Sequence, residues 1–336
     1  MKSHFERMRN VAVPLLVFTF VFAYANLAAA ESAARPSAQA GASAAMPAHE
    51  VLLDDLPQVT TTTRSKPVEI PMRGPLLPNS PHAPQVISPE SKLSPAPAEG
   101  GLRTTPGTLR SFNGEGELGC GGFIPSDHAL ATNASNEVQV INSCITVFTS
   151  TGAVVAGFPK SLNTFFGVAG DLIGDPRALY DWHSGRWIIL AEDFSANNIL
   201  LAASTTASPT GAYHIYSISG TTGNQLPGCA DFPMMGQDNN EIADAKGAIF
   251  VSFDRFNCSS GAFIDDVVWI LPKTPIYAGA GFGFNFFFNF NVGGATLDHI
   301  QPANVMGKPD QPDSEFLINT FDFNAPNFCL FPNPCN

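Results

Sequence analysis

Acidic residues at the ends of expected strands are the side chains of this chain best suited to catalysis. Two carboxylates on one face of a fold can act as acid and nucleophile in glycoside cleavage, with an arginine to hold the substrate. The candidates for such a site are Asp175, Arg177, Asp181, Asp231 and Asp254. The alternative interpretation is structural: Asp175 and Asp181 cap turns and pair with Arg177 or Arg186. The deciding property is whether these acids meet in one pocket.

A second group of side chains has the oxygen-rich composition of a calcium site. It consists of Asp238, Asn240, Glu241 and Asp244. Calcium prefers such ligands, but the group lacks the central glycine and the distant glutamate of an EF-hand loop. Asp and Asn also gather in turns, because their side chains bond the nearby backbone. Calcium is the one cofactor that the sequence suggests.

Other catalytic motifs are missing from the sequence. The histidines are scattered, without an H-x-x-x-H pair or a neighbouring cysteine, which argues against zinc. There is no G-x-S-x-G elbow, Walker loop or strand-anchored G-x-G-x-x-G. Trp182, between Asp181 and His183, is the tryptophan best placed to stack on a sugar, whereas Trp187 and Trp269 are expected in the core.

The cysteines indicate an oxidising compartment. An even number of cysteines in an exported chain predicts disulfides, and none of the spacings fits a C-x-x-C zinc motif. Strands that follow one another in all-β folds usually lie side by side, so we expect cysteines close in sequence to pair. The expected pairs are Cys120 with Cys144, Cys229 with Cys258, and Cys329 with Cys335.

The N-terminal segment has the pattern of a secretory signal. A basic start is followed by an apolar run at 11–24 and by Ala28-Ala29-Ala30, which predicts cleavage near residue 30. The alternative is a membrane anchor over 11–30. We expect an exported protein, periplasmic or extracellular, with no membrane span after cleavage. Cleavage leaves a net charge of about −14, which repels phosphate backbones and argues against nucleic acid.

The composition divides the mature chain in two. Residues 31–110 contain 13 prolines and no Phe, Tyr or Trp, so they have little to bury, and we expect a disordered linker. Aromatic residues begin at Phe112, and 111–336 is expected to fold as one domain. Within it, short β-rich runs separated by turn residues predict an all-β fold.

The clearest strand signal is the segment 282–292. Apolar side chains occupy every even position from Phe282 to Val292, which predicts one continuous aromatic face. We expect that face in the core, with a sugar-stacking platform as the alternative. Strand groups begin near residues 125, 175, 231 and 284, and this period of roughly fifty residues suits four-stranded blades.

Four stretches, taken in order, carry a family resemblance. They are 125–152, starting with Pro-Ser-Asp-His; 174–187, with Gly-Asp-Pro-Arg; 200–216, with Ser-Pro-Thr-Gly; and 231–240, with Asp-Phe-Pro. In this order they resemble secreted bacterial β-propeller-type proteins of mostly unknown function, distantly sialidase-like in architecture. The resemblance implies a small or partial propeller of about four to five blades and carries over no catalytic residue. The alternative fold is a β-sandwich or jelly roll.

Two functions follow as hypotheses. The first is a non-catalytic binding or scaffold propeller for a carbohydrate or a protein surface, presented on the Pro-rich linker. The second is a glycan-active hydrolase or lyase that uses carboxylates on one propeller face. A pair of acids that converges beside an arginine would favour the enzyme hypothesis over the binding hypothesis.

Overall fold

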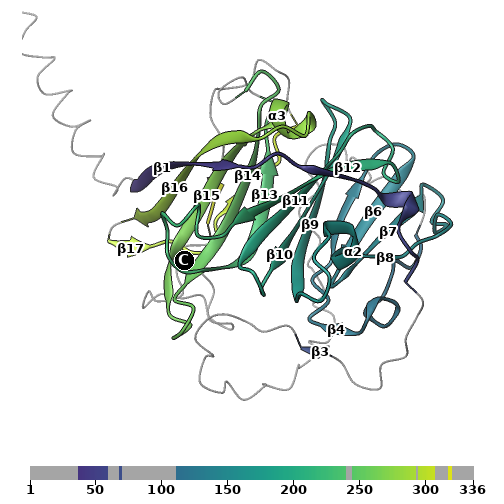
Figure 1. Ribbon diagram of the computed structural model, residues 1–336, viewed down its shortest axis with the longest axis horizontal. Helices are drawn as coiled ribbons and strands as arrows, with labels where there is room; N and C mark the ends of the chain where they lie inside the picture. Colours follow the sequence, from purple (N-terminus) through teal and green to yellow (C-terminus); the bar gives the residue numbers. More distant parts are fainter. Residues whose placement is uncertain are drawn as a thin grey trace, which may run out of the picture.

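Antiparallel strands make up most of the protein in a computed structural model, which describes residues 37–59, 68–69, 111–239, 244–292, 294–306 and 317–319. The strands form three large sheets and two small two-stranded ones in this part of the chain (Figure 1). The prediction of an all-β fold is confirmed.

The first large sheet is built from neighbouring strands in sequence order. They are β5 (Ala129–Thr132), β6 (Asn136–Ile141), β7 (Cys144–Thr149) and β8 (Lys160–Ser161). β6 and β7 pair as an antiparallel hairpin. The short helix α2 (Leu162–Phe166) follows, begins at the hydroxyl of Ser161 and ends at Gly167, whose left-handed backbone conformation favours glycine.

The second and third sheets repeat this arrangement, and each gains a strand from the N-terminal region. The second has the order β2 (His49–Leu52), β12 (Ala212–Ser219), β11 (Asn198–Ser204), β10 (Arg186–Asp193) and β9 (Ile173–Asp181). The third has the order β1 (Ser37–Ala45), β16 (Phe282–Val292), β15 (Phe263–Pro272), β14 (Ala248–Phe256) and β13 (Cys229–Gln237).

Short elements connect or extend these sheets. They are η1 (Leu53–Asp55), β3 (Val68–Glu69) paired with β4 (Phe123–Ile124), η2 (Glu117–Cys120), α3 (Lys273–Tyr277), β17 (Ala295–Thr296) beside β16, and β18 (Gln301–Pro302) paired with β19 (Leu317–Ile318). None of the helices in the described part of the chain is long and apolar enough to cross a membrane.

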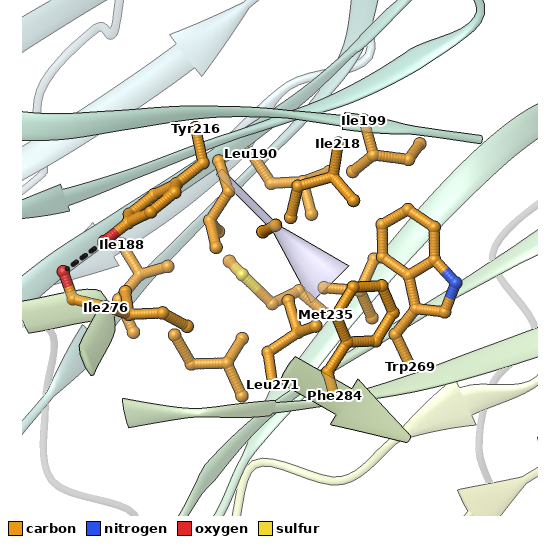
Figure 2. Packing of buried hydrophobic residues seen from close by; sticks show 14 of the residues in the cluster. Ile188, Leu190, Ile199, Tyr216, Ile218, Met235, Trp269, Leu271, Ile276 and Phe284 are labelled. Carbon is orange, nitrogen blue, oxygen red and sulfur yellow. Dashed lines mark hydrogen bonds between the residues drawn. The ribbon is translucent and has the colours of Figure 1, made fainter. Parts of the chain in front are cut away.

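The three sheets pack on one another through two hydrophobic cores. Alternate residues of β10 show why: Ile188 and Leu190 pack toward the third sheet, while Trp187 and Ile189 pack toward the first. Figure 2 shows the core between the second and third sheets, where Trp269 packs beside Phe284 with aliphatic side chains around them. The second sheet is therefore buried on both faces, which a two-layer sandwich does not allow, and the sandwich alternative is wrong for the described strands.

The first strands of the three sheets lie together. β9 packs against both β5 and β13, so the edges at which the three meanders begin face a common region. Loops that enter these strands are thereby brought close to one another. This arrangement decides where polar side chains from distant parts of the sequence meet.

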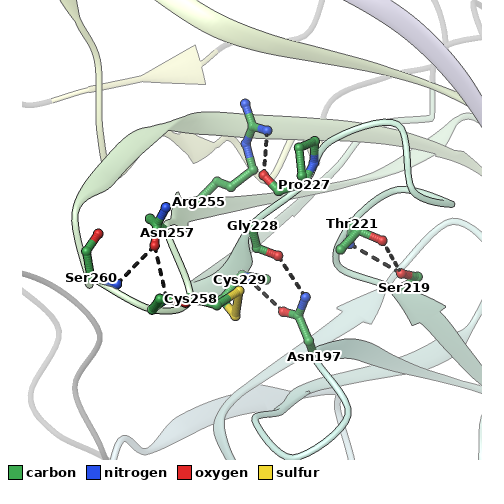
Figure 3. The surroundings of a disulfide bond; sticks show 12 residues. Asn197, Ser219, Thr221, Pro227, Gly228, Cys229, Arg255, Asn257, Cys258 and Ser260 are labelled. Atoms are coloured by element: carbon green, nitrogen blue, oxygen red, sulfur yellow. Dashed lines mark hydrogen bonds between the residues drawn. A yellow bond between two sulfur atoms is a disulfide. The ribbon is translucent and has the colours of Figure 1, made fainter.

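Two of the three expected disulfides are present. Cys120 bonds Cys144 and Cys229 bonds Cys258, with Cα atoms 5.5 and 5.2 Å apart. Figure 3 shows the second bond, beside which Asn197 bridges to the start of β13. Cys329 and Cys335 lie outside the described residues. Disulfides are typical of an oxidising environment, as expected for an exported protein.

The boundaries of the expected linker are wrong at its N-terminal side. Residues 37–52 supply β1 and β2, which complete two sheets far along the chain (Figure 1). The segment lacks aromatic residues because its partner provides them: a Cβ at Gly41 would overlap the ring of Phe286. Small side chains here allow close approach, so low apolar bulk does not mean disorder. The rest of 60–110, apart from β3, lies outside the described residues.

The aromatic strand differs from expectation in two respects. It is the fourth strand of the third sheet, not the start of a fourth strand group. Phe282, Phe284 and Phe286 face the core as predicted, but Phe290 packs on the opposite face. Asn289, whose φ is positive, produces this switch, and the pairing with β1 shifts register at the same place.

Candidate functional site

Three aspartates converge where the first strands of the three sheets begin. Asp127 precedes β5, Asp175 lies near the start of β9 and Asp231 near the start of β13. The side chains of Asp127 and Asp175 share a hydrogen bond. One carboxylate oxygen each of Asp175, Asp231 and the buried Glu192 lies within 4.8 Å of the other two. The fold thus gathers four carboxyl groups from distant segments.

The backbone around these acids is strained at three points. Asp127, Asp175 and Phe232 all have a positive φ, in the left-handed region that non-glycine residues rarely occupy. The pairing of β13 with β14 also shifts register between Asp231 and Met234. Strain of this kind costs roughly 1 to 3 kcal/mol per residue and is typical of functional sites.

Burial among other acids raises the pKa of Asp175 to about 7. Loss of solvent is the largest cause, and the charges of Asp127 and Asp231 add to it. Arg177 acts in the opposite direction but does not cancel the effect. The side chain therefore holds a proton near neutral pH, and a neighbouring carboxylate accepts it in a hydrogen bond. A carboxyl group in this state can donate a proton to a substrate.

Arg177 lies over the aromatic ring of Phe232. Its guanidinium is 5.3 Å from the ring centroid, and it donates to the carbonyl of Pro176 at 3.0 Å and to the sulfur of Met234 at 3.5 Å. Burial lowers the pKa of Arg177, while Asp175 and Asp127 favour its charged form. The Phe232 side chain is 36% exposed, and the ring of His299 meets it edge-on at 5.0 Å.

The cluster borders an open cavity of about 440 Å³. Its walls come from the loop before β5 and from two neighbouring strands: Pro125, Ser126, Asp127, His128, Arg177 and Met234. Asp127 is the acid that lines the cavity, and Asp175 lies behind it through their hydrogen bond. A substrate group in the cavity would therefore meet a carboxylate, a guanidinium and an imidazole at once.

Asp181 does not belong to this site. It lies at the other end of β9, where its carboxylate accepts from the backbone N–H groups of His183 and Ser184 at 3.0 and 3.2 Å. Lys273 lies 3.0 Å away, and the hydroxyl of Tyr277 donates to it at 2.6 Å. The turn-capping interpretation is confirmed, but the cation is Lys273 and not an arginine.

Asp254 also lies elsewhere, on the face of the third sheet turned away from the main core. It stands opposite Asp266 across β14 and β15, and both accept from backbone N–H groups, Asp254 from His299 and Asp266 from Ile300, at 2.9 Å. Burial raises the pKa of both acids. This pair fastens residues 299–300 to the sheet.

The described members of the expected calcium group serve as structural acceptors. Asp238 accepts from the backbone N–H of Ala248 at 2.8 Å, and Asp244 from that of Lys246 at 2.8 Å. Asn240 and Glu241 lie outside the described residues, so calcium binding stays a prediction. Trp187 and Trp269 are fully buried as expected, and Trp182 is 47% exposed at the Asp181 end of β9.

Sequence reasoning missed three members of the cluster. Asp127 lies in the Pro-Ser-Asp-His stretch, where the sequence marks it only as part of the resemblance. Glu192 follows the apolar run 187–191 of β10 and is fully buried, and a charged residue beside such a run is a usable signal of function. Asn142, whose side chain donates to Asp127 at 2.7 Å, lies in the tight turn between β6 and β7, where an asparagine is ordinary, so nothing in the sequence marks it.

Comparison with known proteins gives limited similarity. No family model and no curated protein matches this chain. A solved structure described as a putative exo-β-1,3-galactanase from Bifidobacterium bifidum s17 is 12% identical over 45% of this chain and 50% of that one, with a TM-score of 0.27. An exo-β-1,3-galactanase from Phanerochaete chrysosporium, solved with β-1,3-galactotriose, is 10% identical over 43% and 42%, also at 0.27. This chain thus spans half or less of these enzymes.

Proposed function

We propose that this protein is a glycan-active hydrolase in which Asp175 is the proton donor. One observation carries the proposal: a buried carboxyl group, Asp175, lies beside a second one, Asp127, that lines an open cavity. Burial and the neighbouring acids raise the pKa of Asp175 to about 7. A pair of carboxyl groups in different protonation states is what glycoside cleavage requires. This favours the hydrolase hypothesis over a non-catalytic binding module.

The two carboxyl groups have separate roles in the proposed reaction. In the free protein, Asp175 gives its hydrogen bond to Asp127; a glycosidic oxygen entering the cavity takes that place. The proton moves from Asp175 to this leaving oxygen as the glycosidic bond breaks, and Asp127 forms a bond to the anomeric carbon. Water then cleaves that bond with Asp175 as base.

Neighbouring side chains are suited to hold the sugar. The guanidinium of Arg177 faces the cavity and can donate to ring hydroxyl groups. Phe232 offers a partly exposed ring beside it, on which the apolar face of a sugar can stack. These contacts would orient the substrate without taking part in proton transfer.

The proposed fold is a β-propeller of which the described residues form three blades. Each large sheet contains a meander of four successive strands, and the three first strands lie together, as they do around a propeller axis. The acids at these strands would then lie at one face near that axis. The two disulfides agree with an exported protein that meets its glycan outside the cytoplasm.

A hydrolysis screen with matched variants tests the proposal. Wild type is incubated with oligosaccharides of galactose, glucose, xylose, arabinose and sialic acid, and released sugars are measured alongside binding by NMR. We expect hydrolysis of one class, and a loss of about 10²- to 10⁴-fold in Asp175→Asn, with binding retained. Asp244→Asn, which changes an acid in a distant turn, should match wild type. Binding without hydrolysis by wild type would establish the binding module instead, and full activity of Asp175→Asn would refute the assigned acid.

A further inference from the structure

Asn142 connects the two acids of the proposed site through its side chain. It lies between β6 and β7 and is fully buried. Its Nδ2 donates to the carbonyl of Pro125 at 2.9 Å and to Oδ2 of Asp127 at 2.7 Å, while its Oδ1 accepts from the backbone N–H of Asp175 at 2.9 Å. Its own backbone N–H donates to the carbonyl of Ser126 at 2.9 Å.

These partners fix the orientation of the amide. The oxygen faces an N–H group, which can only donate, and the nitrogen faces a carbonyl and a carboxylate, which accept. A rotated amide would place two donors together on one side and three acceptors on the other. The side chain therefore presents a donor to Asp127 and cannot act as an acceptor for a proton on that acid.

We propose that Asn142 is the positioning residue that holds the carboxyl group of Asp127 beside Asp175. Its Nδ2 fixes one oxygen of Asp127 and its Oδ1 fixes the backbone of Asp175, so the two acids keep one relative position. The charge of Asp127 is one cause of the raised pKa of Asp175, so this position can be followed at Asp175. The catalytic meaning of this arrangement rests on the proposed function, but the titration of Asp175 can be measured without any substrate.

Other charged groups also lie near Asp175. Asp231 disfavours a charge on it, Arg177 favours one, and an oxygen of Glu192 lies within 4.8 Å. His128 lines the cavity on the Asp127 side. Asn142 is hydrogen-bonded to the carboxylate of one acid and to the backbone of the other, so its removal should change how the two acids lie relative to each other.

The test is a ¹³C NMR titration of the aspartate carboxyl carbons in the intact chain. Asp127→Asn and Asp175→Asn assign the two signals. In wild type we expect the step near pH 7 on Asp175. In Asn142→Ala, Asp127 loses its tether and can move away, so that step should fall by about half a pH unit or more. A folded Asn142→Ala protein in which the step of Asp175 is unchanged would overturn the proposal.

Two further variants keep the result interpretable. Asn142→Asp has the same shape but replaces the donor by a third acid, so we expect the upper step to rise by about one pH unit or more; an unchanged step would contradict the proposal. Asn197→Ala is the matched control, because Asn197 also donates from its amide nitrogen and accepts at its amide oxygen, in both cases with a backbone group, of Gly228 and Ala230 (Figure 3). It should leave both signals as in wild type. If no glycan is cleaved, this titration still decides the role of Asn142.

Discussion

The two ends of strand β9 hold the same residue in opposite electrostatic states. Loss of solvent and the charges of neighbouring acids together raise the pKa of Asp175 to about 7. Burial also acts on Asp181, but Lys273, Tyr277 and a turn N–H outweigh it and lower the pKa of that acid. Both aspartates end one strand of one sheet, so neither residue type nor position in the strand determines the difference.

The comparison shows that partners separate a reactive acid from a structural one. Asp181 has a cation and three hydrogen bonds, which leave its carboxylate committed to holding β9 against α3. The backbone N–H of Asp175 donates to Asn142, but its carboxyl group is buried among other acids. Ionising a carboxyl group in such surroundings reduces stability. The stabilising acid and the reactive acid thus lie near opposite ends of the same strand, β9.

The largest expected effect comes from breaking the structural end. Lys273→Met removes the cation from a fully buried pair and leaves Asp181 charged without it, so we expect a loss of about 3 to 5 kcal/mol in the free energy of unfolding. Guanidinium denaturation at pH 7, with the disulfides intact, measures it. The double variant Lys273→Met with Asp181→Asn should recover part of the loss. A loss below about 1 kcal/mol would mean that the pair is not a stabilising one.

Opposite pH dependence should distinguish the two acids. The pKa of Asp175 is higher in the folded state than its ordinary 3.8, so wild type should lose stability as pH rises from about 4 to about 7. Asp175→Asn should lose less, because only Asp254, Asp266 and the other acids with raised pKa values then contribute. At pH 8 we expect this variant to be about 4 kcal/mol more stable than wild type, and equal to it near pH 3.5. Asp181, whose folded pKa is lowered, contributes stability above its ordinary value that is lost as pH falls below it.

Urea denaturation of wild type, Asp175→Asn and Asp181→Asn across this pH range provides the measurement. If the free energy of unfolding depends on pH in the same way in both variants, the proposed difference between Asp175 and Asp181 is contradicted.

The smallest effect concerns the arginine that moderates the reactive end. Because Arg177 lowers the pKa of Asp175 against the other influences, Arg177→Met should raise it further, by about one unit. The same ¹³C titration that follows Asp175 reads this shift directly. Arg186→Met, at the other end of the hairpin, is the control. A fall in the pKa would show that the guanidinium does not reach Asp175.

Sequence patterns predict the strands of this fold better than its site. Alternation and turn residues place most strands of the three sheets, and neighbour pairing gives two disulfides, because these features depend on residues close in sequence. β1 and β2 escape notice because their stability comes from partners supplied by β16 and β12.

The site shows the same limit. Asp175, Arg177 and Asp231 are recognisable as polar residues at strand starts, but their convergence follows from the packing of three first strands. Lys273 is unpredictable as the partner of Asp181, since only the fold brings α3 beside the end of β9. The raised pKa of Asp175 depends on the fold in two ways. The fold brings other acids to Asp175, and it places Lys273 beside Asp181 instead.

The pairing of β1 with β16 has a consequence for how the chain avoids aggregation during synthesis. The strand made first, β1, is rich in Ala, Ser and Gly, so it has little tendency to aggregate before its partner strand is made. The last long strand of this sheet is the aromatic one, which as an open edge would recruit other chains. When it emerges, β1 and the rest of the third sheet are already there to cover it on both sides. The order of the strands along the chain therefore keeps its most adhesive segment exposed for the shortest time.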